Sequence, residues 1–253
     1  MTDLMTKPPK KTSDKELTVL EHLEELRQRI IQMLLVVTVA AVAVYFFVDP
    51  LLEIILQPLQ ASGERVYFLS IPGAFLVKLK LAVLCGVIIG FPVLFWHSWA
   101  FTAPGLYDHE KKIVKKLLIP SAVLFLCGVS FAFFGIVPFA VKFFLQFQNA
   151  ALRPLISVEE YISFVGGLVL AFGLAFQLPV LMVGLVYLGV LSTEVLRRGR
   201  PFVVVGIMVA SAVLTPPDVV SQILLAIPMW GLFEGSLFVA RLTELKKARN
   251  HEK

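Results

Sequence analysis

Charged residues are scarce in this 253-residue chain: they make up 16% of it, whereas hydrophobic residues make up 58%. A soluble domain carries about 25% charged residues, so the composition argues against one. The two cysteines, Cys85 and Cys127, both fall inside apolar runs, where they resemble small buried thiols rather than a disulfide or a metal site. The four histidines show no metal-ligand spacing.

Sequence motifs of catalysis are also missing. No glycine precedes a lysine, so the chain has no ATP-binding loop of the Walker type, and neither HExxH nor GxSxG occurs. An intramembrane enzyme would need a nucleophile–base pair or two aspartates at membrane depth, and neither is visible. A small-solute secondary transporter would be expected to show an internal repeat, which is also not visible. We therefore expect no enzyme, cofactor or metal.

What the chain has instead is a series of long uncharged runs. A transmembrane helix needs about 20 apolar residues to cross about 30 Å of hydrocarbon, which predicts an all-α integral membrane protein. The fourth run has 33 uncharged residues, which we interpret as one long tilted helix containing Pro179, and the last two spans are short. The six predicted spans are 30–48, 75–99, 117–141, 161–193, 201–216 and 219–240.

Proline inside these spans predicts kinked helices, because it removes a backbone hydrogen bond. Kinked helices can surround a hollow, which favours a concave, cupped bundle, although ordinary helix irregularity would give the same pattern. The prolines are Pro92, Pro120, Pro138, Pro179 and Pro228.

The basic residues are distributed unevenly between the two sides of the predicted bundle. Eighteen lysines and arginines fall on the side that holds both termini, and five fall on the other. Positive residues concentrate in cytoplasmic loops, so residues 1–29 and the tail 241–253 are predicted to be cytoplasmic. Because the charge follows this topology rule, the net charge of +5 does not indicate nucleic-acid binding.

The segment "LTVLEHLEELRQRI", residues 17–30, has the apolar period of a helix. Thr18 and Glu21 match a capping box, and Glu25 and Arg29 stand four residues apart in the favourable order. We expect an amphipathic helix that lies on the cytoplasmic surface and runs into the first span. From the pattern alone, a surface anchor with solvated charges is the preferred explanation of this segment.

Three residues, two glutamines and one glutamate, raise the question of what a polar side chain does within a predicted span. Gln177 lies near the middle of the fourth span, where an unpaired amide is costly, so it either faces a functional cavity or bonds a neighbouring helix. Glu234 lies toward the cytoplasmic end of the sixth span, where it either extends to the interface or pairs with a lysine. Gln222 lies near the outer end of the same span.

Three longer stretches resemble the TatC family, the receptor subunit of the twin-arginine protein translocase. They are "HLEELRQRI" before the first span, "FTAPGLYDHEKK" between the second and third, and "LTPPDVVSQILLAIPMWGLFE" across the last two. The resemblance extends over about residues 17–241 and implies a single membrane domain over residues 1–253.

The resemblance implies that the chain binds twin-arginine signal peptides of folded cargo at the cytoplasmic face of the bacterial inner membrane. It implies TatA and TatB as single-span partners, several TatC copies in the receptor complex, surrounding membrane lipid, and transport driven by the proton-motive force. Glu110 and Glu25 match the acids expected to receive the peptide's arginines. The matching positions that would shape the site are Phe101, Pro104, Leu106 and Tyr107, with Arg27 expected to orient Glu24 or Glu25.

One position departs from the family. Glutamate is frequent where this chain has Gln177, and a neutral amide cannot carry a proton, so we expect a hydrogen-bonding contact with a TatA or TatB helix instead. Pro58, Ser70 and Asp218 match periplasmic positions and are expected to shape the outer cap and its contacts between TatC copies.

Overall fold

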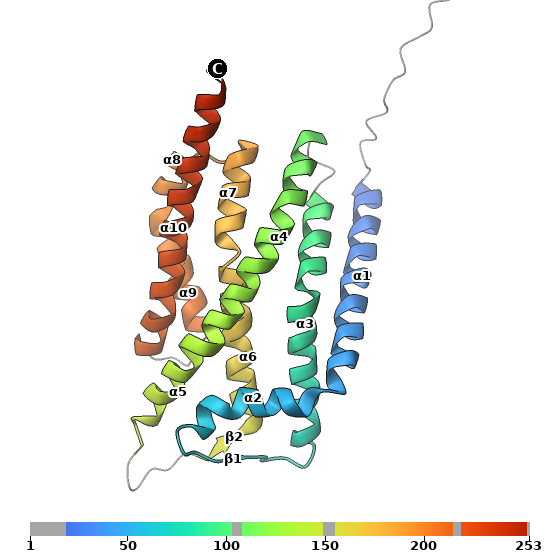
Figure 1. The fold of residues 1–253 in the computed structure, drawn as a ribbon, viewed down its shortest axis with the longest axis vertical. Helices are drawn as coiled ribbons and strands as arrows, with labels where there is room; N and C mark the ends of the chain where they lie inside the picture. The colour runs from blue at the N-terminus through green and yellow to red at the C-terminus, as the bar shows by residue number, and fades with distance from the viewer. Residues whose placement is uncertain (1–18, 103–107, 149–154, 215–218, 252–253) are drawn as a thin grey trace, which may run out of the picture.

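The computed structural model describes residues 19–102, 108–148, 155–214 and 219–251, and these are mostly helical. Figure 1 shows the helices side by side, with α1 at one edge and the α9–α10 pair at the other. At one end of the molecule α1 and α4 begin and α3 and α7 end, and we call this the α8 end. We call the opposite end the α2 end. The helices are α1 Val19–Tyr45, α2 Val48–Gln60, α3 Gly73–Thr102, α4 Asp108–Phe131, α5 Val137–Leu145, α6 Val158–Ala175, α7 Leu178–Leu188, α8 Thr193–Arg198, α9 Arg200–Leu214 and α10 Val219–His251.

The membrane-spanning parts agree with the uncharged runs of the sequence. Five segments of the described chain are long and apolar enough to cross a bilayer, and α9 is a shorter apolar helix. The predicted six-span helical architecture is thereby confirmed. The five segments are Leu20–Tyr45, Gly73–Phe101, Leu117–Leu145, Val158–Tyr187 and Leu225–Leu242.

The first span differs from the sequence prediction. α1 is one continuous helix from Val19 to Tyr45, so the charged segment continues the axis of the span and does not form a separate surface helix (Figure 1). Leu20 and Leu23 of this segment are exposed in the chain by itself. Thr18 of the proposed capping box lies outside the described residues.

The fourth span was predicted as one helix and is instead two. α6 ends at Ala175, α7 begins at Leu178, and Phe176 and Gln177 form a turn between them. Pro179 falls in the first turn of α7, where its missing N–H leaves no helical bond unmade. The proline therefore starts a new helix here rather than kinking an existing one.

The sixth span belongs to a much longer helix than the sequence predicted. α10 has 33 residues, and its apolar part is followed by a charged extension that remains helical to His251. The spanning part of α10, Leu225–Leu242, has 18 residues and α9 has 15, so the last two spans are short, as predicted. The third span also contains a wider turn, the π-helix η2 at Ala132–Ile136, between α4 and α5.

The sequence reading did not anticipate α2. This amphipathic helix crosses beneath the bundle at the α2 end and buries Val48, Leu56 and Leu59 (Figure 1). Beside it, β1 Val66–Tyr67 and β2 Ile156–Ser157 form a short parallel pair. The hydroxyl of Tyr161, in α6, donates to the carbonyl oxygen of Ile55 at 3.0 Å and so ties α2 to the spans.

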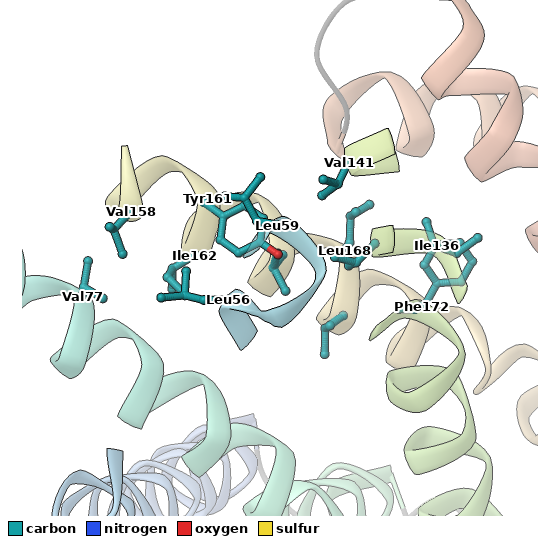
Figure 2. Close-up of a cluster of buried hydrophobic side chains, with 14 of the residues drawn as sticks. Leu56, Leu59, Val77, Ile136, Val141, Val158, Tyr161, Ile162, Leu168 and Phe172 are labelled. Carbon is teal, nitrogen blue, oxygen red and sulfur yellow. The ribbon is translucent and has the colours of Figure 1, made fainter. Parts of the chain in front are cut away.

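The largest buried cluster lies where α2 meets the spans. Figure 2 shows Leu56 and Leu59 from α2 beside Tyr161 and Ile162 from α6. The cluster continues along α6 to Phe172, which is 1% exposed. α6 is therefore the central support of the bundle.

Two glycines permit close helix crossings. A Cβ atom on Gly86 of α3 would lie 2.9 Å from the backbone N of Ala41 and 2.9 Å from the carbonyl oxygen of Val37, both in α1. A Cβ atom on Gly128 of α4 would lie 2.6 Å from the carbonyl oxygen of Phe172. Carbon atoms do not approach backbone atoms this closely, so α1 packs on α3, and α4 on α6, only because these side chains are absent.

Candidate functional site

The first candidate region lies at the α8 end, where α1 and α3 meet. The ring of His22, near the start of α1, stacks on Phe101 in the last turn of α3, with centroids 4.3 Å apart and planes 17° apart. This contact brings the charged motif of α1 next to the first residue of the "FTAPGLYDHEKK" stretch. Two segments that the sequence singled out separately thus belong to one surface.

Glu25 lies one turn beyond His22 on α1. Its Oε1 accepts hydrogen bonds from Nε of Arg29, at 2.9 Å, and from Nη2 of the same guanidinium. Its Oε2 lies 3.9 Å from Nδ1 of His22, too far for a normal hydrogen bond. Glu25 and Arg29, which the sequence placed four residues apart in the favourable order, therefore form an ion pair.

Arg27 was expected to orient Glu24 or Glu25, and the structure pairs it with Glu24. Its Nη1 donates to Oε2 of Glu24 at 3.3 Å, and both side chains are at least half exposed. Such exposed pairs contribute little stability. Arg27 does not bond Glu25 in this arrangement.

The remaining residues of the loop motif are less fully described. Glu110 falls in the first turn of α4, which begins at Asp108, and its side chain lies outside the described part. Pro104, Leu106 and Tyr107 also lie outside the described residues. The first turn of α4, which contains Glu110, nevertheless lies at the same end of the molecule as the start of α1 and the end of α3 (Figure 1).

A second candidate region is a groove of about 720 Å³ along the spans. Its walls come from α1, α3, α4, α6 and α7, and it is almost entirely apolar. Gln177 contributes an amide to its lining. The lining includes Met33, Phe91, Trp99, Phe125, Leu174, Gln177 and Leu181.

Gln177 is also fully engaged with a neighbouring helix. Its Oε1 accepts from the hydroxyl of Ser121 at 2.6 Å, and its Nε2 donates to the carbonyl oxygen of Ser121 at 3.2 Å. Both side chains are buried, at 5% and 0% exposed. This two-way bond joins α4 to the turn between α6 and α7, so the helix–helix alternative for Gln177 is realised.

The polar residues of α10 bond to α9. Oε2 of Glu234 lies 2.7 Å from Nη2 of Arg200, so its partner is an arginine and not the lysine suggested by the sequence. Nε2 of Gln222 donates to the carbonyl oxygen of Met208 at 2.9 Å. These two contacts hold α9 against α10 at positions far apart along the pair.

At the α2 end, Ser70 donates to Oε1 of Glu159 at 2.7 Å, which joins the α2–α3 connection to α6. Pro58 lies inside α2, and its carbonyl oxygen accepts from the hydroxyl of Ser62 at 3.2 Å. Asp218 lies outside the described residues.

Two lysines at the start of α3 bind side chains of other helices: Lys78 pairs with Asp49 at 2.6 Å, and Lys80 donates to Ser163 at 2.7 Å.

Sequence reasoning missed His22, Ser121 and Arg200. Each makes its important contact with a residue distant in sequence: Phe101, Gln177 and Glu234. A usable signal existed only for Arg200, because a carboxylate within a span requires a cation near its depth. Nothing in the local sequence distinguishes His22 or Ser121.

The chain matches the family described as "TatC: Sec-independent protein translocase protein (TatC)" over residues 21–228. It is 37% identical over 241 residues to the Sec-independent protein translocase protein TatC of Carboxydothermus hydrogenoformans, covering 95% of this chain and 99% of the relative. The corresponding protein of Escherichia coli K12 is 37% identical over 237 residues and 92% of each chain. A crystal structure described as the twin arginine translocase receptor TatC superimposes with a TM-score of 0.79 and 36% identity, covering 88% of this chain and 99% of that one.

Proposed function

This chain belongs to the TatC family, and from that membership we propose that it binds the twin-arginine signal peptides of folded proteins at its α8 end. As a TatC protein it is a multi-pass membrane component of the twin-arginine translocase and is not an enzyme. The proposal concerns the site of recognition and the residues that carry it.

Carboxylates are the chemical partners that two guanidinium groups require. Each charge-assisted hydrogen bond contributes about 1.5–3 kcal/mol, and arginine can bind a carboxylate through two N–H groups at once. Glu25 and Glu110 supply one carboxylate each, from α1 and from the first turn of α4. The stacking of His22 on Phe101 is the observation that best supports a shared surface, because it joins the α1 motif to the end of α3.

The charge distribution supports the proposed orientation. The side with eighteen basic residues is the α8 end, which in a bacterial inner membrane would face the cytoplasm, where the cargo is made. Both chain termini would then be cytoplasmic. We place TatA and TatB beside this chain as partners in transport driven by the proton-motive force. Further TatC copies would meet around Pro58, Ser70 and Asp218.

The test is binding of a twin-arginine signal peptide to the purified protein in nanodiscs. We expect Glu110→Gln and Glu25→Gln each to weaken binding about tenfold, since each removes one charged acceptor. A twin-lysine peptide should bind the wild type more weakly, because an ammonium cannot make the two-point contact. Unchanged affinity in both variants would contradict recognition by these two carboxylates.

The apolar groove supports a second contact, with a single-span partner helix. Gln177 lines this groove, although its amide is bonded to Ser121, so a partner helix would meet a surface that is already ordered. A photoreactive residue at position 177 is expected to crosslink to TatA or TatB in membranes. The same residue at Phe202, exposed on α9, is the control position, and equal yields at both positions would contradict a specific contact.

A further inference from the structure

The carboxylate proposed to receive a cargo arginine already holds an arginine of this chain. Arg29 donates to Glu25 from both Nε and Nη2. A signal-peptide arginine would also offer two N–H groups, one to each oxygen of the carboxylate. Both bonds from Arg29 end on Oε1 and neutralise the charge of the carboxylate, whereas Oε2 accepts no bond from Arg29. A cargo guanidinium that binds both oxygens of Glu25 must displace Arg29 from Oε1, so the two arginines compete.

Of the arginine–glutamate pairs within one helix at this end, in the described part of the chain, the pair formed by Arg29 and Glu25 is also the most sheltered. The side chains of Arg29 and Glu25 are 21% and 26% exposed, against 69% and 50% for Arg27 and Glu24. The pair on α8, Arg198 and Glu194, is 80% and 72% exposed. Water and salt screen the attraction between two charges less when the charges are more buried. The ion pair of Arg29 and Glu25 should therefore be stronger than the two exposed pairs.

We propose that Arg29 is a built-in competitor for the Glu25 site and thereby sets the affinity threshold for signal peptides. This inference rests on the proposed function of Glu25. A cationic segment meets the full charge of Glu25 only after displacing Arg29, so the apparent affinity falls with the fraction of time that Glu25 is free. Weakly bound lysine-rich or single-arginine segments would then remain unbound, while twin-arginine peptides exceed the threshold.

Competition makes a specific quantitative prediction. Every cationic ligand meets the full charge of Glu25 only when this internal contact is broken, so removing the contact strengthens all of them by one common factor. We expect Arg29→Gln to lower the Kd of a twin-arginine peptide and of a twin-lysine peptide by the same factor, about two- to tenfold. The ratio of the two Kd values should not change.

Two further variants separate competition from a general effect of charge. Arg198→Gln removes the same charge from a pair of the same spacing at the same end, and should leave both Kd values unchanged. Arg29→Lys keeps the charge but loses the two-point contact, so it should give part of the gain. The increase from Arg29→Gln should vanish when Glu25→Gln is present. Weaker or unchanged binding by Arg29→Gln, or an equal gain from Arg198→Gln, would overturn the proposal.

A measurement without peptide tests the internal contact independently. Carbodiimide coupling of glycine ethyl ester, read by mass spectrometry in nanodiscs, reports how accessible the carboxylate of Glu25 is. Labelling of Glu25 should rise severalfold in Arg29→Gln and stay constant in Arg198→Gln. If labelling rises but no variant binds peptide, the proposed function fails while the internal pair stands. If peptide binds and labelling does not change, Arg29 is not a competitor.

Discussion

Replacing Gly86 with leucine is expected to detach α1 from the bundle and abolish signal-peptide binding. A side chain at this position meets the α1 backbone at Ala41 and Val37, and a helix backbone cannot move aside as a flexible side chain can. α3 is the main neighbour of α1, so α1 has little else to hold it in place. Overpacking of this kind costs about 1–3 kcal/mol or more, and it would separate His22 from Phe101.

The measurements are thermal unfolding in detergent and peptide binding in nanodiscs. Gly206→Leu is the matched control, because Gly206 lies on α9 with open space where a Cβ would be. Gly86→Ala, a smaller change at the same site, should give a partial loss of both stability and binding. Equal melting temperatures for Gly86→Leu and Gly206→Leu would show that the close crossing of α1 and α3 is not needed.

Glu234→Ala is expected to destabilise the protein by about 2–3 kcal/mol, because it leaves the guanidinium of Arg200 without its carboxylate. This loss of stability is smaller than the loss expected for a fully buried pair, because the side chains of Glu234 and Arg200 are still 30% and 42% exposed in the chain by itself. The loss should appear as a lower melting temperature and as release of α9 from α10, detected by protease sensitivity of the pair.

A double variant shows whether the charge or the packing matters. Arg200→Met combined with Glu234→Met removes both charges while keeping comparable volume, and even for a fully buried ion pair such a replacement is often neutral or stabilising. We expect it to recover most of the stability lost in Glu234→Ala. If the double variant is less stable than Glu234→Ala alone, the ion pair contributes through a route other than charge compensation.

Much of the fold was predictable because the bilayer imposes a simple rule on length and polarity. The spans follow the uncharged runs closely, with α3 and the α4–α5 segment matching their predicted positions. α2 escaped prediction because it is amphipathic, contains Asp49, Glu53 and Pro58, and is too short to cross. The separation of α6 from α7 also escaped, because Pro179 is compatible with a kink as well as with a new helix.

The site was predictable only where its contacts are local in sequence. The pair of Glu25 and Arg29 follows directly from four-residue spacing on one helix. The stacking of His22 on Phe101 and the bonds between Ser121 and Gln177 depend on how distant helices pack. Periodicity says which face of a helix is apolar, but it does not say which helix that face will meet.

The 15 residues of α9 have a consequence for the surrounding lipid. At 1.5 Å per residue the helix is about 22 Å long, well short of the roughly 30 Å thickness of a hydrocarbon core. Figure 1 shows that the pair formed by α9 and α10 stops well before the level of α2. Acyl chains beside this edge must shorten or tilt, at a fraction of a kcal/mol for each ångström of mismatch. We therefore expect the hydrocarbon to be thinner on the flank of the molecule opposite α1 than beside the longer spans.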